Sequence, residues 1–197
     1  MNTGNSRNRE QSDKNSAPGG DSDSALHILM EDHKRVRKLF ADFKKLKESE
    51  GGQDEAKADL VQQICKELLI HARVEEEIFY PAVRAGISDQ DLMDEAAVEH
   101  AVATDLVEQL MEMRPGDALF DAKVGVLAES VEHHIKEEEG AMFTQAQKAN
   151  VLTQVLGEQV FQRKQELLAE MELPKSSKGK PKRTSGKKSR GGHAVLH

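Results

Sequence analysis

The chain has 197 residues, 37% hydrophobic and 32% charged, with 28 lysines and arginines, 35 aspartates and glutamates, and one cysteine. This length allows one domain with a hydrophobic core plus tails, and a lone cysteine excludes an internal disulfide. The sequence contains no apolar run of about 20 residues and no secretory signal at its start, so we expect a cytoplasmic protein with no membrane partner.

The two ends of the chain differ in composition from the rest. Residues 1–23 are rich in Ser, Asn, Gly and Asp, while residues 174–197 hold eight lysines and arginines and no acidic residue; we expect both to be disordered tails. Residues 24–173, the expected folded domain, carry 17 basic and 31 acidic residues, a net charge of −14. Such a domain repels nucleic acid, so we expect at most weak binding to nucleic acid through the basic tail. A solubilising role is the simpler reading of that tail, because no aromatic residues lie among its lysines to stack on bases.

Residues that start and stop helices divide the expected domain into five helices. We expect them at residues 24–48, 54–81, 88–113, 117–148 and 151–173, with caps at Asp23 or Ser24, at Asp54, and at Ser88 with Asp91, and with Pro81 and Pro174 as stops. Glu, Lys, Ala, Leu and Gln favour helices, so the fold class is all-α. Four long helices with short connections predict an antiparallel up-down-up-down four-helix bundle, with the short fifth C-terminal helix against its outside.

Each of the four long helices carries a histidine near its middle, and two of them carry a glutamate one turn later. These candidate metal ligands are His33, His71 and Glu75 in the first two helices, and His100, His134 and Glu138 in the next two. "EDH" followed 38 residues later by H-x-x-x-E recurs as "VEH" followed 34 residues later by H-x-x-x-E. The two halves therefore resemble two copies of one helical hairpin, and a surface accident would not repeat.

A histidine and a glutamate four residues apart share one face of a helix and can reach one metal ion together. The neighbouring positions on this face are apolar: Ile64, Leu68, Ile78, Phe79, Leu127, Val131, Ala141 and Met142. An uncompensated carboxylate buried there costs several kcal/mol, which a cation would offset. Four imidazoles, two carboxylates and no thiolate favour iron, with manganese or zinc as competitors. Six ligands exceed one tetrahedral zinc but suit two ions bridged by the carboxylates, each with two histidines and an open position.

Other polar residues near these positions are expected to lie outside the centre. Tyr80 comes nine residues after His71, on the opposite side of an ideal helix, so its phenol should pack at a helix junction. His27 and His133 are expected at the surface or in support of the ligands, and Glu76, Glu77, Glu137 and Glu139 are expected to form a solvated face.

In this order and spacing, the motifs resemble the hemerythrin family, in particular bacterial proteins with a hemerythrin HHE cation-binding domain. The resemblance covers residues 24–173 and rests on "LMEDHKRVRKLFADF", "HARVEEEIFYPAV", "VEHAVATDLVEQL", "HHIKEEEGAMF" and "LGEQVFQRKQELL". It implies a non-haem di-iron centre that binds oxygen reversibly, senses oxygen or iron, or processes peroxide or nitric oxide. The implied ligands are His33, His71, His100 and His134 as terminal ligands and Glu75 and Glu138 as bridges, with an oxo bridge as an option.

One position departs from the oxygen-carrying hemerythrins. They have a further histidine four residues after the ligand of the third helix, where this chain has Thr104. A missing imidazole predicts a more open centre, which favours a protein that processes peroxide, oxygen or nitric oxide over a carrier. The alternative is a sensor or store of oxygen or iron without turnover. Six candidate ligands disfavour a metal-free structural bundle.

Overall fold

The computed structural model describes residues 24–49 and 51–172, and every regular element in them is a helix. The prediction of an all-α fold is therefore confirmed for this part of the chain. The two predicted tails lie outside the described residues, as do Asp23, Leu173 and Pro174. Among the described helices, none is long and apolar enough to cross a membrane.

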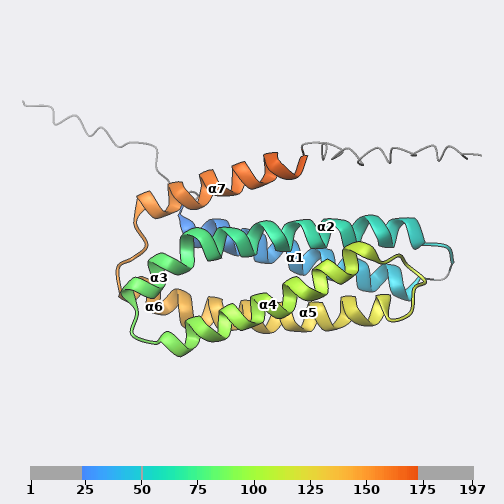
Figure 1. Cartoon of the computed structure of the whole chain (residues 1–197), viewed down its shortest axis with the longest axis horizontal. Coiled ribbons are helices and arrows are strands. Elements are labelled where there is room, and N and C mark those ends of the chain that lie inside the picture. The colour runs from blue at the N-terminus through green and yellow to red at the C-terminus, as the bar shows by residue number, and fades with distance from the viewer. Residues whose placement is uncertain (1–23, 50, 173–197) are drawn as a thin grey trace, which may run out of the picture.

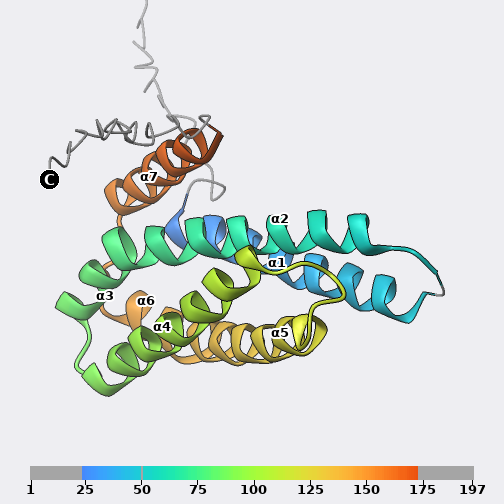
Figure 2. The same ribbon diagram turned by 45° about the vertical axis from the view of Figure 1, so that its right-hand side comes forward.

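The long helices form four rods that lie side by side (Figure 1). Their bounds are α1 Ala25–Glu48; α2 Asp54–Val74, continued by η2 Glu75–Phe79 and α3 Tyr80–Gly86; α4 Gln90–Glu112; and α5 Phe120–Glu137, continued by η3 Glu138–Met142 and α6 Phe143–Lys148. The first rod packs on α2 and α5, and α4 also packs on both. The last helix, α7 Gln154–Glu172, lies along α1 and α2, on the side away from α4 and α5 (Figure 2).

The helices begin close to the predicted positions, with differences in their caps. Ser24 caps α1 as predicted, its hydroxyl accepting a backbone hydrogen bond. Asp54 is the first residue of α2 rather than its cap. The predicted capping box of Ser88 and Asp91 does not form, because Asp89 caps α4 instead. The helices predicted to start at residues 117 and 151 each begin three residues later.

The second rod does not end at Pro81, which corrects the prediction. Glu75 starts a π-turn, in which the Tyr80 N–H donates to the Glu75 carbonyl five residues back. Pro81 then falls in the first turn of α3, where a missing N–H leaves no helical bond unmade. The same turn recurs at Glu138, whose carbonyl accepts from the Phe143 N–H. Such π-turns inside α-helices are rare and frequently mark functional sites.

Two apolar clusters fill the interior, and a layer of buried polar residues separates them. The first cluster includes Leu29 of α1 and the second includes Val36, one helical turn on either side of His33. Each of the other three rods also contributes residues to both clusters. The contribution changes from one cluster to the other between Ile64 and Val74 in the second rod, between Ala96 and Val107 in the third, and between Val131 and Met142 in the fourth. Each change occurs next to a candidate ligand. The apolar packing above and below therefore fixes the rods and excludes water from the polar layer.

Candidate metal centre

The six predicted ligands all lie in this buried layer, each at most 7% exposed. They fall into two groups, and within each group the donor atoms lie within 4.8 Å of one another. The first group is His33, His71, Glu75 and Glu138, and the second is Glu75, His100 and His134. Because Glu75 belongs to both groups, the two groups are neighbours within one centre.

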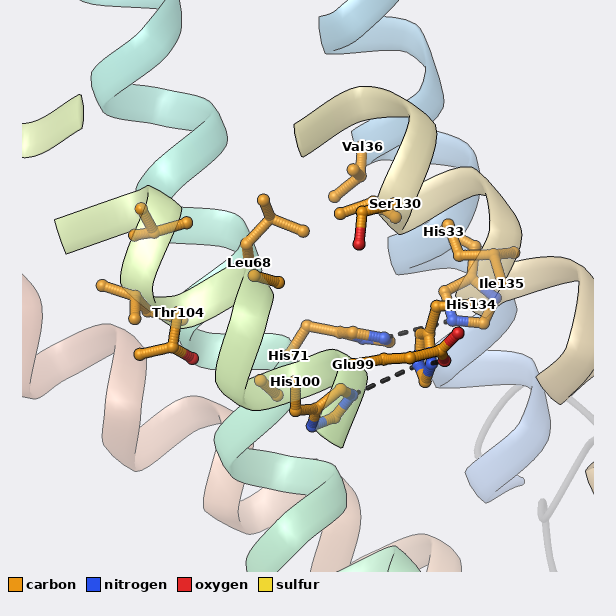
Figure 3. A pocket seen from close by; sticks show the side chains of 15 residues that line it. His33, Val36, Leu68, His71, Glu99, His100, Thr104, Ser130, His134 and Ile135 are labelled. Carbon is orange, nitrogen blue, oxygen red and sulfur yellow. Dashed lines mark hydrogen bonds and ion pairs between the residues drawn. The ribbon is translucent and has the colours of Figure 1, made fainter. Parts of the chain in front are cut away.

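The histidines are paired within each group. The Nε2 atoms of His33 and His71 lie 3.1 Å apart, and those of His100 and His134 lie 3.2 Å apart (Figure 3). Two donors at right angles, each about 2.1 Å from an ion, are about 3 Å apart. The spacing within each pair therefore suits two histidines bound to one ion.

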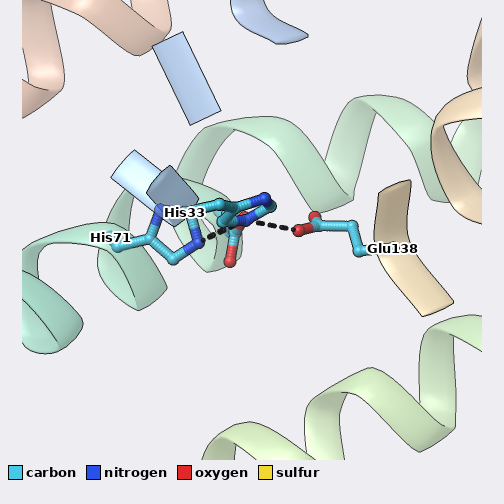
Figure 4. Close-up of side chains that lie close together, drawn as sticks. His33, His71 and Glu138 are labelled. Atoms are coloured by element: carbon cyan, nitrogen blue, oxygen red, sulfur yellow. Dashed lines mark hydrogen bonds and ion pairs between the residues drawn. The ribbon is translucent and has the colours of Figure 1, made fainter. Parts of the chain in front are cut away.

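The carboxylates test whether a cation fits the centre. Glu138 Oε2 lies 3.1 Å from His33 Nε2 (Figure 4), and Glu75 Oε1 lies 3.0 Å from His71 Nε2. Despite these distances, neither oxygen has a hydrogen-bond partner among the described residues. Buried carboxylate oxygens without partners are costly. An ion at the point on which nitrogens and oxygens converge would satisfy them all, so the residues fit a metal.

The pKa values show where the metal-free centre holds its protons. Burial and then the Glu75 charge raise the pKa of Glu138 to about 7. Burial would also raise the pKa of Glu75, but His71 and His100 lower it well below the ordinary range. Burial lowers the pKa of His71, yet Glu75 and Asp32 outweigh this and raise it to about 10. Protons thus occupy positions that a metal ion would take, and ion binding would release them.

Tyr80 also faces the centre, so the prediction that its phenol packs elsewhere is wrong. Its Oη lies 3.2 Å from His100 Nε2, 3.3 Å from His134 Nε2 and 3.4 Å from Glu75 Oε2. In an α-helix, a residue five positions after Glu75 would point about 140° away from it; the π-turn brings it back to the same side. Burial and the charges of Glu138 and Glu75 raise the pKa of Tyr80 well above its ordinary value, so the phenol keeps its proton.

Every histidine of the centre has a carboxylate near its outer ring nitrogen, Nδ1. The pairs are His33 with Glu139 at 2.8 Å, His71 with Asp32 at 3.7 Å, His100 with Glu76 at 3.0 Å, and His134 with Glu99 at 2.9 Å. A carboxylate in this place holds the proton on Nδ1 and leaves Nε2 free for a metal. The three hydrogen-bonded pairs therefore orient their imidazoles toward the centre, whereas Asp32 makes only an ion-pair contact with His71, whose Nδ1 has no hydrogen-bond partner among the described residues.

Glu76 is exposed and Glu139 partly exposed, as expected for a solvated face, but each also contacts a candidate ligand, which was not predicted. Asp32 and Glu99 were not predicted at all, although a signal was present: both stand directly before a histidine, in "EDH" and "VEH". Ala141 is exposed rather than on the apolar seam, because it lies within a π-turn. The remaining expectations hold, with His27, His133 and Glu77 exposed and Glu137 partly exposed.

A cavity of about 40 Å³ lies beside the four histidines (Figure 3). Its wall is mostly apolar and includes Val36, Leu68, Val107, Val131 and Ile135, with the hydroxyl-bearing residues Thr104 and Ser130. Because a water needs roughly 10 to 15 Å³, the cavity has room for only about three or four molecules of that size. It suits a ligand of a few atoms.

Comparisons with known proteins agree with this geometry. Residues 24–146 match the family model of the hemerythrin HHE cation-binding domain. A DNA nickase from Nostoc sp. is 30% identical over 116 residues, which are 59% of this chain and 31% of that protein, so the chain spans about a third of the relative's length. The crystal structure of a hemerythrin HHE cation-binding domain-containing protein from Mycobacterium kansasii matches with a TM-score of 0.61 and 24% identity, over 75% of this chain and 88% of that one. The structural match shows a shared fold.

Proposed function

The chain belongs to the hemerythrin HHE cation-binding family, and we propose that it is a non-haem di-iron protein that binds or processes oxygen, peroxide or nitric oxide. The observation that carries the proposal is the convergence of four imidazole nitrogens on two buried carboxylates that lack hydrogen-bond partners. In this proposal, the four rods form an up-down-up-down four-helix bundle whose interior holds the ions.

We assign one ion to His33 and His71 and the other to His100 and His134, with Glu75 and Glu138 between them. Glu75 supports the bridging role because its two oxygens lie 3.0 Å from His71 Nε2 and 3.3 Å from His100 Nε2. Glu138 Oε2 lies 3.1 Å from His33 Nε2 and 3.9 Å from His134 Nε2, so it also reaches both pairs. Imidazoles and carboxylates without a thiolate favour iron, with manganese or zinc as competitors.

Two iron ions in this centre would supply open coordination positions and electrons for a small ligand. The side chains of the protein orient the histidines, limit access to the centre and supply a hydrogen-bond donor. Glu139, Glu76 and Glu99 keep a proton on Nδ1 of His33, His100 and His134. The apolar cavity wall admits a ligand of a few atoms and limits water. Tyr80 keeps its proton at Oη beside the second histidine pair, where it can donate a hydrogen bond to an entering ligand.

The presence of Thr104 favours a protein that processes its small ligand over an oxygen carrier. Thr104 borders the cavity, where an additional imidazole would occupy one open coordination position of a metal ion. A sensor or store of oxygen or iron without turnover is the alternative. We do not extend the DNA-nicking function named for the Nostoc relative to this chain, since the chain spans only about a third of that protein and the domain's net charge of −14 repels DNA.

Peroxide decomposition by the iron-loaded protein tests the proposal. We expect many turnovers per chain, and we expect the double variant with His100→Ala and His134→Ala to lose them. His133→Ala is the matched control, because His133 neighbours His134 but is exposed. Consumption of no more than one peroxide per centre would favour the sensor or store instead.

A further inference from the structure

Lys164 is a buried cation on α7, a helix that lies beyond the residues matched by the family model. Only 9% of the residue is exposed. Its Nζ donates to Oδ1 of Asp32 on α1, across 132 residues of sequence. Lysines are almost never this buried without a partner, so the pair with Asp32 explains how Lys164 is accommodated.

Asp32 connects Lys164 to the candidate metal centre, because it also contacts His71. Its second oxygen, Oδ2, lies 3.7 Å from Nδ1 of His71. The side chains of the other three outer carboxylates are 21 to 49% exposed and so reach water, whereas that of Asp32 is only 5% exposed. Asp32 therefore depends on cations supplied by the protein. The half-exposed Arg35 also contacts Oδ1, at 3.2 Å, so Lys164 is the buried one of two cations on this oxygen.

We propose that Lys164 is a positioning residue for the metal centre: it holds Asp32 against His71, and docking of α7 thereby strengthens metal binding by the pair His33 and His71. The proposal rests on the proposed function, since it concerns one of the two ions. Without Lys164, Asp32 would lose its buried cation and keep only the half-exposed Arg35, so its 3.7 Å ion-pair contact with His71 Nδ1, a nitrogen with no hydrogen-bond partner among the described residues, would loosen. Loss of such a contact to a ligating histidine typically lowers metal affinity about 10- to 100-fold.

The docking of α7 has supports that do not involve Lys164. Leu156, Val160 and Leu167 are buried in the first apolar cluster. On the outside, Arg163 Nε donates to Glu77 Oε2 at 2.6 Å. Lys164→Met keeps the length and the apolar stem of the side chain, so we expect α7 to stay in place in this variant. Arg163→Gln is the matched control, because it removes a neighbouring contact between α7 and the second rod without touching Asp32.

Zinc titration of the full chain, in competition with a chromophoric chelator, tests the proposal. We expect the wild type to bind two ions, Lys164→Met to bind one of them about 10- to 100-fold more weakly, and Arg163→Gln to match the wild type. In a chain that also carries His100→Ala and His134→Ala, Lys164→Met should lower the affinity for the single remaining ion by the same factor. Lys164→Gln, which keeps a donor for Asp32 without its charge, is a second variant and should show a smaller loss of the same ion.

Asp32→Asn supplies the decisive comparison. If Lys164 acts through Asp32, adding Lys164→Met to Asp32→Asn weakens binding no further. Equal affinities in wild type and both Lys164 variants would overturn the proposal while leaving the proposed centre intact. An equal loss of both ions in Lys164→Met and Arg163→Gln would also overturn it, because it would show a general effect on the fold. A wild type that binds no ion would refute the proposed function itself.

Discussion

Tyr80 and Phe143 occupy matching places in the two halves of the protein, five residues after Glu75 and Glu138, and each ring lies against a histidine of the centre. The centroid of Tyr80 is 5.3 Å from that of His100, and the centroid of Phe143 is 6.1 Å from that of His33. Both rings are placed by a π-turn. Only Tyr80 carries a hydroxyl, so the two halves of the centre differ chemically at this pair of positions.

Tyr80→Phe should make the two halves alike at this pair of positions and lower peroxide turnover about 100-fold, because the hydrogen bond that Oη can donate is lost while the ring stays. Steady-state rates of the iron-loaded variant measure the effect. Phe143→Leu serves as the control, since it removes a ring from the centre but no hydroxyl, and it should cost stability rather than turnover. An unchanged rate in Tyr80→Phe would rule out the hydrogen-bond-donor role, and loss of one metal ion would identify Tyr80 as a ligand instead.

The stability of the metal-free protein should fall as the pH rises from about 4.5 to about 7. Burial raises the pKa of Glu138 from 4.5 to about 7 in the folded chain, so its contribution is fully present below pH 4.5 and is lost as the pH passes 7. Glu138→Gln should flatten this dependence and stabilise the metal-free chain at pH 8 by about 3 kcal/mol, since one pKa unit is worth about 1.4 kcal/mol. Denaturant unfolding at several pH values measures both. Parallel profiles for the two chains would mean that the carboxyl is not buried beside Glu75.

Thr104→His should convert the open centre toward a carrier. Thr104 lies one helical turn after His100 and borders the cavity, so an imidazole there can reach the second ion and fill its open position. We expect this variant to lose peroxide turnover and to hold oxygen for longer, as followed by stopped-flow absorption. Thr104→Val keeps the volume without the hydroxyl and should retain turnover. If the unmodified protein already holds oxygen for minutes and ignores peroxide, the preference for processing over carriage is wrong.

The sequence predicted the all-α fold and the burial of the six candidate ligands because both depend on regular repeats. His33, His71, His100 and His134 could be found from their spacing alone, and the apolar positions around them predicted their burial. The outer carboxylates Asp32 and Glu99 lie in the same repeated motifs and could have been included.

The two π-turns could not be predicted from a constant helical period. One extra residue in a turn rotates all following side chains around the helix axis. A prediction based on an ideal α-helix therefore put Tyr80 and Ala141 on the wrong face and ended the second rod at Pro81. Contacts between distant segments are also invisible to a local pattern. Lys164 looks like an ordinary residue of a polar helix, and only the packing of α7 on α1 shows that it meets Asp32.

The central claim is that the six residues hold two metal ions, and metal analysis after anaerobic loading with ferrous iron and gel filtration tests it most directly. We expect about two irons per chain in the wild type. The double variants His33→Ala with His71→Ala, and His100→Ala with His134→Ala, should each retain one, because each removes a single pair. A wild-type chain that retains one zinc, or no metal after loading, would contradict the claim.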